Sequence, residues 1–284
     1  MHVLVAGAGW LGVALVRALA GRGDRVTAVR RDPDRAALLR SAGAEPLFVD
    51  LARPGSGALL PAGVDAVVAC QAAGSDGAEP YRRAYVDANR TLLEVARRGG
   101  ARALVYTAST GVFGQRDGSD VDEATPAAPA SPAAEVLAEA EALVLGDRAV
   151  PSIVLRLSGL YGPGRLWPLE RVRGGQLALG PGDDAWMNFC HLDDAVAAVL
   201  AAIDRGRPGA VYHATDANPA RRREVVEWVA GRLGIPAPRA PEGARPRGGA
   251  HRRIHGERTR AELGLALRYP SFRDGLLAAL GGGA

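Results

Sequence analysis

The stretch GAGWLG at residues 7–12 constrains the fold of this chain more than any other feature. It follows the apolar run His2–Ala8, which has the composition of a buried parallel strand, and an amphipathic stretch comes next. Gly7 permits a tight turn, Gly9 lets the backbone approach a pyrophosphate, and Gly12 lets the helix pack against the strand. The pattern predicts a dinucleotide held at the start of a helix, whereas the alternative is a tight turn with no ligand. The predicted contact residues are Gly7, Gly9, Trp10, Leu11 and Gly12.

Strands and helices alternate along most of the chain. After the first strand, further strands are expected at Arg25–Arg31, Glu45–Asp50, Asp65–Gln71, Ala101–Ser109, Ser152–Gly159 and 211–215. Helices are expected at Leu11–Ala20, Pro33–Ser41, Tyr81–Arg98, 132–146, 221–233 and 272–280. Such alternation implies a parallel sheet that is covered by helices on both faces. The sequence therefore predicts a Rossmann-type, doubly wound α/β fold.

The alternation becomes less regular after Gly164, and a Pro/Gly/Arg-rich stretch at 236–250 reads as a loop. We expect a dinucleotide-binding domain at 1–163, to which the segment 188–215 returns. Residues 164–284 should mainly form a small C-terminal substrate-binding lobe. The reacting centre should then lie between the two parts, over the carboxyl ends of the strands.

The end of the second strand carries the residues that select between NAD and NADP. NAD-binding sites usually place an acid there for the ribose hydroxyls, whereas this chain has Arg30 and Arg31 followed by Asp32. Two guanidinium groups suit the 2′-phosphate of NADP, so NADP is the predicted cofactor, with NADPH preferred over NADH. In the alternative, Arg31 points to solvent and Asp32 caps the next helix. Asp50 and Leu51 close the third strand and could contact the adenine, although Asp50 could equally only end the strand.

The chain contains no lysine, so all 35 residues in the Lys+Arg count are arginines. This excludes Schiff-base catalysis and a P-loop lysine, because arginine is too basic to replace a titrating amine. The arginines are scattered and the net charge is +4, which favours a solvated surface over a nucleic-acid groove. The two cysteines have no metal-type spacing, and the longest apolar run, Ala195–Ile203, is too short to cross a membrane. We expect a cytoplasmic protein without a metal site.

Several further motifs occur in order along the chain. They are CQAAG (70–74), LVYTASTGVFG (104–114), LRLSGLYGPGR (155–165), NFCHLDD (188–194) and VYHATDANPARRREVVEWVAGRLGIP (211–236). With the glycine turn, they resemble the extended short-chain dehydrogenase/reductase superfamily, of the NAD(P)-dependent epimerase/dehydratase type, over nearly the whole chain. The resemblance implies that Ser109 donates a hydrogen bond to a substrate oxygen, with Thr110 as a second donor. It also implies that residues 161–164 close over the nicotinamide. Further cofactor contacts are expected from Gln71, Ala72 and Ala73.

The Tyr-x-x-x-Lys pair of that superfamily is missing from the sequence. Aligned on the Ser-Pro that precedes the pair, the tyrosine position is Ala133 and the lysine position is Leu137. No tyrosine lies between residues 107 and 160. In the superfamily the lysine holds the ribose and lowers the pKa of a phenol that otherwise titrates near ~10. The chain thus resembles the atypical branch of the superfamily, and its helix at 132–146 reads as structural.

Two other residues could supply a proton. Tyr85 could donate from its phenol, with Asn89 one turn farther along the same helix face. Alternatively, Tyr81 and Tyr85 form a packing stripe. His191 titrates near neutrality when it is unperturbed, but a histidine in such a segment more often supports loops from a buried position.

The remaining candidates concern the substrate. Tyr161 belongs to the loop expected over the nicotinamide, and Arg165 could pair with a substrate carboxylate or phosphate. Trp167 and Trp186 could stack on a flat substrate, or could equally fill the smaller lobe. Cys70 could be a nucleophile, although a cysteine at the end of an apolar strand is usually a small core residue.

These observations predict an NADP-dependent oxidoreductase, or an epimerase/dehydratase-type enzyme, that acts on a small polar metabolite and uses a non-standard proton donor. Two alternatives stay open. One is a non-redox lyase, isomerase or cyclase on the same fold, and the other is a cofactor-binding sensor or scaffold without turnover. In the resembled superfamily the helices at 81–98 and 132–146 often pair across subunits as a four-helix bundle, which implies a homodimer.

Overall fold

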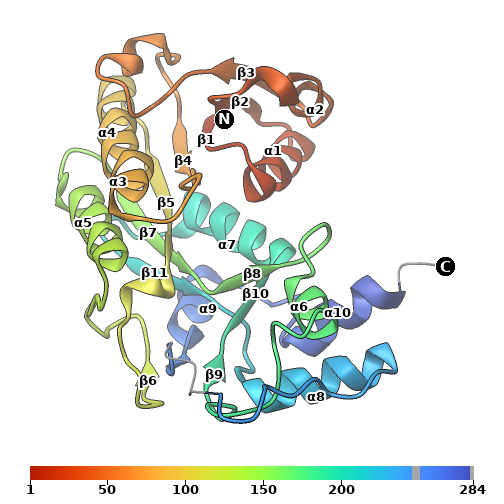
Figure 1. The fold of residues 1–284 in the computed structure, drawn as a ribbon. Coiled ribbons are helices and arrows are strands. Elements are labelled where there is room, and N and C mark those ends of the chain that lie inside the picture. The colour runs from red at the N-terminus through yellow and green to blue at the C-terminus, as the bar shows by residue number, and fades with distance from the viewer. Residues whose placement is uncertain (245–249, 282–284) are drawn as a thin grey trace.

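The computed structural model describes residues 1–244 and 250–281. Its main element is a seven-stranded parallel sheet in the order β11-β7-β5-β4-β1-β2-β3 (Figure 1). The strands are β1 (His2–Ala6), β2 (Arg25–Arg30), β3 (Ala44–Phe48), β4 (Ala66–Ala69), β5 (Ala103–Ser109), β7 (Ser152–Leu157) and β11 (Val211–Ala214). Each lies within one of the expected strands except β3, which begins one residue before the expected strand, and the Rossmann-type α/β fold is confirmed. The loop expected at 236–250 falls partly outside the described residues.

The strand order reverses between β1 and β4. From β1 the chain builds β2 and β3 outward on one side, and it then returns to place β4 on the other side of β1. In doubly wound sheets, ligands bind in the crevice at the carboxyl ends of the strands where the order reverses. The glycine turn directly follows β1, so the fold places it at this reversal.

Helices cover both faces of the sheet. Because side chains alternate along a strand, Val3 and Val5 pack into the core on one face, whereas Leu4 and Ala6 pack into the core on the other. The helices on the first face are α1 (Trp10–Gly21), α2 (Ala36–Ser41) and α7 (Leu192–Arg205), and those on the second are α4 (Ala88–Gly99) and α5 (Pro132–Gly146).

The helix expected at Tyr81–Arg98 consists of three parts. α3 (Ala78–Tyr81) is followed by a π-helical turn at Arg82–Asp87, and α4 then continues to Gly99. π-Helical turns are rare in proteins, and those that occur are often found at functional sites. The π-helical turn could not be predicted from the sequence, because one wider turn barely changes the spacing of about 3.6 residues between apolar positions in a helix. The turn contains Tyr85, and it lies beside the crevice described below.

α5 has the bounds that were expected for it. Ser131 caps its first turn, because its Oγ accepts a hydrogen bond from the Ala134 amide at 3.2 Å. Farther along, the buried Glu141 carboxylate pairs with Arg156 of β7, with 2.7 Å between Oε2 and Nη2. Burial raises the pKa of Glu141, and Arg156 opposes this shift. The ion pair joins α5 to the sheet.

A second apolar core holds together a small lobe. The helices of this lobe lie at the lower right of Figure 1. The elements of the lobe include α6 (Trp167–Arg173), α8 (Arg222–Leu233), α10 (Phe272–Gly281), β8 (Gly159–Tyr161) and β10 (Phe189–His191). Short strand pairs flank it: β9 (Trp186–Met187) with β12 (Ala220–Arg221), and β6 (Asp120–Val121) with β13 (Arg253–Ile254). α9 (Glu257–Leu263) differs, because its Leu263 packs into the core of the main sheet. The lobe expected at 164–284 is therefore less sharply separated than its sequence range suggests.

Within residues 1–244 and 250–281, every helix is too short or too polar to cross a membrane.

Candidate active site

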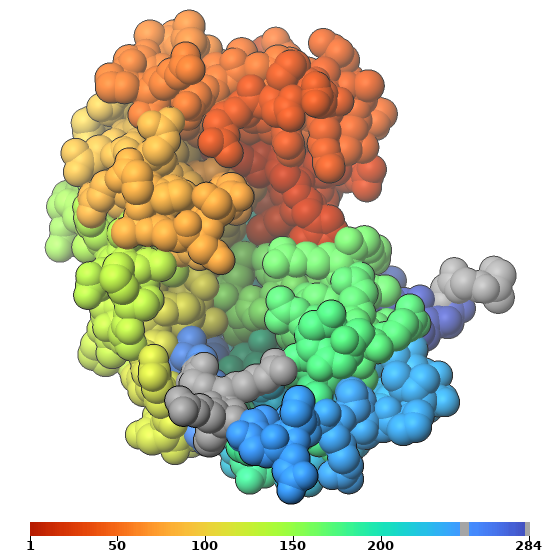
Figure 2. All heavy atoms as spheres, viewed as in Figure 1, coloured from red at the N-terminus to blue at the C-terminus, as the bar shows by residue number. Residues whose placement is uncertain are grey.

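A cleft of about 970 Å³ runs across the carboxyl ends of the strands. In Figure 2 the surface is hollowed between the N-terminal segments, coloured red to orange, and the green segment that follows β7. The cleft is bounded by the glycine turn, the ends of β2 and β3, the loop after β4, the π-helical turn, and the ends of β5 and β7. Of the residues predicted to bind a cofactor, all but Gly12 are in its lining. These are Gly7, Gly9, Trp10, Leu11, Arg30, Arg31, Asp50, Leu51, Gln71, Ala72 and Ala73.

The glycines of the turn have two different roles. Gly7 has a φ of +85°, and a Cβ on it would lie 2.2 Å from the Gln71 Cα. A Cβ on Gly12 would lie 2.6 Å from the Gly7 carbonyl oxygen. These two positions need glycine for the fold itself. A Cβ on Gly9 would meet only the Gly7 oxygen, at 3.8 Å, so among the described residues nothing in the protein requires glycine there.

Gly9 also precedes α1 as its cap residue. No side chain of the described residues caps this end of α1, so its first amides and its dipole can act on a ligand in the cleft. The free space at Gly9 adjoins these amides. Both observations fit a pyrophosphate at this turn.

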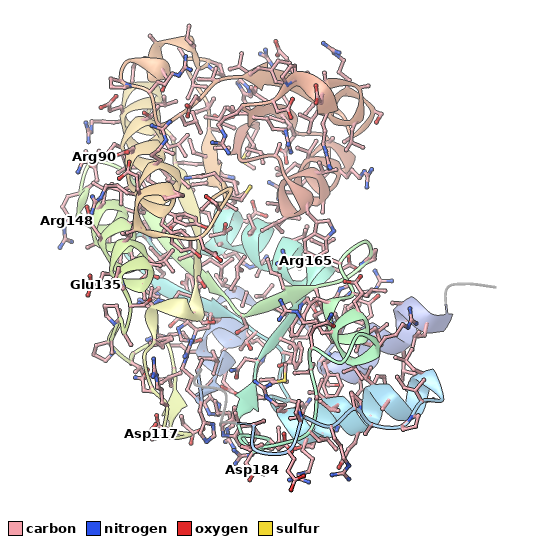
Figure 3. The ribbon with its side chains drawn as sticks, viewed as in Figure 1. Arg90, Asp117, Glu135, Arg148, Arg165 and Asp184 are labelled. Atoms are coloured by element: carbon pink, nitrogen blue, oxygen red, sulfur yellow. The ribbon has the colours of Figure 1, made fainter. Side chains whose placement is uncertain are left out.

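Trp10 links the glycine turn to the loop after β8. Its indole Nε1 donates a hydrogen bond to the Pro163 carbonyl oxygen at 2.9 Å. The Arg165 guanidinium carbon lies 5.6 Å from the centre of the Trp10 ring, within range of a cation–π contact. Figure 3 shows Arg165 on that loop, on the side toward α1. Arg165 lines the cleft, as expected, and is exposed to solvent there.

Three charged residues at the end of β2 have separate tasks. Arg30 braces the glycine turn by donating from Nη1 to the Ala8 carbonyl oxygen at 2.7 Å. Arg31 is exposed at the edge of the cleft, beside Gly74. Asp32 accepts a hydrogen bond from the Asp34 amide at 2.9 Å and caps the short helix that follows. Arg31 is thus the cation best placed to meet a ligand from this strand end.

Asp50 and Gln71 are both held by residues from the helices over the second sheet face. Asp50 accepts a hydrogen bond from Nη2 of Arg83, in the π-helical turn, at 3.0 Å. Gln71 donates from Nε2 to the Asn89 Oδ1 at 3.0 Å. Arg83 also lines the cleft, and the sequence reasoning did not identify it. The only sequence feature that could have indicated Arg83 is its position two residues before Tyr85.

Ser109 ends β5 and lines the cleft. Its Oγ accepts a hydrogen bond from the Gly111 amide at 3.0 Å, which fixes the oxygen and leaves the hydroxyl proton available for donation. The Thr110 hydroxyl differs, because it donates to the Leu157 carbonyl oxygen at 3.4 Å. Leu137, which we aligned with the family's lysine, also lines the cleft, whereas Ala133 does not.

Tyr85 faces the same space. Its phenolic oxygen accepts a hydrogen bond from the Ala73 amide at 3.3 Å, so the phenolic proton is not used in that contact. Burial raises the pKa of Tyr85, which keeps the phenol neutral and able to donate. The ring of Tyr81 packs edge-to-face on that of Tyr85 at 5.2 Å. Tyr81 and Tyr85 therefore form the packing stripe, and the hydroxyl of Tyr85 also faces the cleft.

His191 does not line the cleft, so its expected role as a proton donor needs correction. It is buried and caps α7, because Nδ1 accepts a hydrogen bond from the Asp193 amide at 3.1 Å. The ring lies against Tyr269, with 3.9 Å between ring centres. Burial lowers the pKa of His191 and favours the neutral ring. The histidine supports the segment that returns to the sheet.

The three aromatic residues expected at the substrate also lie outside the cleft lining. Tyr161 is fully buried in the core of the lobe, and Trp167 stacks on Phe189 with 5.6 Å between ring centres. Trp186 is covered by the Arg221 guanidinium, whose carbon lies 3.5 Å from the ring centre. Buried and ligand-facing aromatic residues have the same sequence signature, and for Trp167 the alternative, that it fills the smaller lobe, agrees with its contacts.

The thiol of Cys70, the candidate nucleophile, lies 3.4 Å from the Gly7 carbonyl oxygen, and burial raises the pKa of Cys70 to about 12. It is a protonated core residue beside the turn. Within the described part of the chain, no group of three or more His, Cys, Asp or Glu residues is arranged to hold a metal ion.

Comparisons with known proteins agree with this geometry. The sequence model of the NAD dependent epimerase/dehydratase family matches residues 3–215. A 3-diazoavenalumate denitrifying reductase from a Streptomyces species is 33% identical over 303 aligned positions, which cover 97% of this chain and 99% of that protein. A putative NAD-dependent epimerase/dehydratase from Methylobacillus flagellatus superposes with a TM-score of 0.80 at 30% identity, covering 99% of this chain and 98% of that one. A dTDP-glucose 4,6-dehydratase from Streptomyces venezuelae, solved with NAD bound, has a TM-score of 0.81 at 25% identity, covering 97% and 94%.

Proposed function

Because the chain is an enzyme of the NAD-dependent epimerase/dehydratase family, we propose that it is an NADP-dependent reductase of a small polar metabolite. One observation carries the proposal. The open side of Gly9 and the free hydroxyl proton of Ser109 belong to the same continuous cleft. A dinucleotide held at one end and a substrate oxygen held at the other would share that space.

The residues present fit a nicotinamide dinucleotide. When bound, this cofactor would supply the hydride. Gly9 and the first amides of α1 would hold its pyrophosphate, and Arg31 would hold the 2′-phosphate of NADP. Asp32 is already used as a helix cap, so the acid that would favour NAD has another partner. These contacts support NADP over NAD.

The choice of NADP predicts a selective effect of Arg31. We expect Arg31→Ala to weaken NADPH binding about tenfold, or ~1.4 kcal/mol, and to leave NADH binding unchanged, because only NADPH carries the 2′-phosphate. Calorimetric titration of both cofactors measures this. Arg35→Ala is the matched control, since Arg35 is an exposed arginine of the next turn and is outside the cleft lining. Equal losses for NADPH and NADH would contradict the assignment.

Ser109 and Tyr85 would bind the substrate oxygen. The Ser109 oxygen is fixed by the Gly111 amide and the Tyr85 oxygen by the Ala73 amide. Each hydroxyl can then donate its proton toward the cleft. The raised pKa of Tyr85 makes it a neutral hydrogen-bond donor rather than a base at neutral pH.

The role of Tyr85 can be separated from packing. We expect Tyr85→Phe to lower kcat by about three- to tenfold, the value of one hydrogen bond, with little change in the free energy of unfolding. Tyr81→Phe is the control, because Tyr81 shares the ring contact but lies outside the cleft lining. Steady-state kinetics and thermal unfolding of both variants decide the point. Equal kcat values for the two variants would assign Tyr85 to packing alone.

A second candidate reaction is the reductive loss of nitrogen from a diazo compound. The Streptomyces relative is named as a denitrifying reductase of such a compound. A neutral diazo carbon first takes up one proton from solvent and becomes a diazonium carbon. When that carbon accepts hydride, N₂ leaves, and atoms and charge balance. Leu137 favours this candidate, because an apolar residue stands in the cleft at the position we aligned with the family's lysine.

One experiment tests both reactions. The enzyme is incubated with NADPH carrying deuterium at C4 of the nicotinamide and with matched carbonyl and diazo compounds, and the products are analysed by mass spectrometry. Deuterium at the former carbonyl carbon supports carbonyl reduction, and deuterium at the former diazo carbon supports loss of nitrogen. Unlabelled product would overturn hydride transfer and favour a non-redox reaction. Binding of NADPH without conversion of either class would favour a sensor.

We also propose a homodimer that pairs the helices over the second sheet face. In α5, Ala140 is buried against the protein's own sheet and Ala134 is also buried, so they are not the outer contact surface. The outer side carries charges, including Glu139, which pairs with Arg82 at 2.6 Å. A contact through this side would therefore be polar.

A further inference from the structure

Arg252 is a buried cation that lacks a counter-charge. Only 7% of its surface is exposed, and its Nη2 donates to the Thr110 carbonyl oxygen at 2.6 Å. Among residues 1–244 and 250–281, no carboxylate pairs with it and its Nε has no hydrogen-bond partner, and its guanidinium carbon lies 6.0 Å from the centre of the Phe113 ring. A buried charge without a partner costs several kcal/mol, so such a residue is expected to meet an anion.

The backbone of Arg252 is fixed directly behind the cleft. The Asn188 side chain donates to the Arg252 carbonyl oxygen at 3.0 Å and accepts from the Ile254 amide at 2.8 Å. The Asn188 carbonyl oxygen accepts from the amide of Gly159, which lines the cleft. From this anchor the side chain reaches Thr110, the residue after Ser109. Arg252 is not in the present lining and lies one layer behind it.

The charges along the cleft are unevenly distributed. The acids of its lining are Asp32, Asp50 and Glu79, at the ends of β2 and β3 and on α3. The substrate end, which we define as the lining at the ends of β5 and β7 together with Leu137, Leu160 and Arg165, contains no acid among the described residues. The buried Glu141 nearby is neutralised by Arg156 at 2.7 Å. Burial lowers the pKa of Arg252 to about 10, so it stays charged at neutral pH.

From this juxtaposition we propose that the enzyme acts on an organic carboxylate whose charge is balanced at the substrate end by Arg252, acting from behind Thr110. The inference rests on the proposed function and defines its substrate class. Leu137, Leu157 and Leu160 supply apolar contacts for the body of the substrate. Arg165 also lies at this end but is exposed to solvent, so among the described residues here Arg252 is the one desolvated guanidinium and matches a monoanion such as a carboxylate better than a phosphate dianion.

The test measures selectivity for charge in the full-length protein. Benzoate and trans-cinnamate are titrated by calorimetry against their amides, which have similar shape and no charge, and phenyl phosphate is the third arm. The variants are Arg252→Gln, which removes the charge, and Arg252→Lys, which keeps it. Arg253→Gln is the matched control, because the neighbouring Arg253 pairs with Asp120 at 2.8 Å. Thermal unfolding confirms that each variant is folded.

We expect the wild type, Arg253→Gln and Arg252→Lys to bind the carboxylates at least about tenfold more tightly than the amides. Arg252→Gln should lose this preference and keep the NADPH affinity of the wild type. An undiminished preference in folded Arg252→Gln overturns the proposal, as does a wild type that binds neither carboxylate or that prefers phenyl phosphate. If NADPH fails to bind while the carboxylate preference holds, the proposed reductase function fails and the anion site stands.

Discussion

Gly9→Val should weaken NADPH binding by about 100-fold or more, or ~2.7 kcal/mol, while the protein stays folded. A Cβ at this position meets only the Gly7 carbonyl oxygen, at 3.8 Å, so the valine side chain enters the free space of the turn. That space adjoins the uncapped start of α1, where the pyrophosphate would lie. The free energy of unfolding should change by no more than about 1 kcal/mol, because a Cβ at this position makes no close contact with the protein.

Gly7→Ala is the contrasting variant for this experiment. Its Cβ would lie 2.2 Å from the Gln71 Cα, and its φ of +85° is unfavourable for alanine. We expect a loss of unfolding free energy of about 1–3 kcal/mol or more. Calorimetry and denaturant unfolding on both variants separate loss of ligand from loss of fold. Wild-type NADPH affinity in Gly9→Val would show that the cofactor does not occupy this turn.

Ser109→Ala should lower kcat by about 100-fold or more and leave the NADPH affinity unchanged. The substitution removes a fixed hydroxyl donor at the reacting centre, an effect of the size seen when one oxyanion-hole donor is lost. Steady-state kinetics with the substrate found by the deuterium experiment, together with NADPH titration, measure the two quantities.

Ser131→Ala controls for the structural part of this loss. Both serines accept a main-chain hydrogen bond through Oγ, Ser109 from Gly111 at 3.0 Å and Ser131 from Ala134 at 3.2 Å. Each variant should lose about 1 kcal/mol of unfolding free energy, the usual value of a cap. Only Ser109 lines the cleft, so only its variant should lose turnover. Similar kcat values in the two variants would remove Ser109 from the reaction.

The sheet could be predicted well because its signals are local. Short Val-rich runs between helical stretches identified the seven strands, and the spacing of Gly7, Gly9 and Gly12 located the first crossover. The strand order depends on contacts that are distant in sequence, and no local pattern determined it. The π-helical turn at Arg82–Asp87 was missed because one wider turn barely changes the hydrophobic period.

The site was predicted in part, for the same physical reason. Main-chain requirements are visible in sequence, so the glycine turn and the position of Ser109 at a strand end could be identified. Whether an aromatic or imidazole ring faces a cleft or a core depends on tertiary packing, so the sequence left both alternatives open for His191 and Trp186. Arg252 had no local signal at all, because its significance lies in the missing carboxylate partner among the described residues.

The most direct test of the central claim is calorimetric titration of the wild-type protein, freed of any nucleotide retained in purification. NADPH, NADP⁺, NADH and NAD⁺ are compared under the same conditions. We expect NADPH to bind in the micromolar range and NADH to bind at least about tenfold more weakly. Binding of none of the four would contradict a dinucleotide-dependent reductase and would leave the cleft to a reaction without a nicotinamide cofactor.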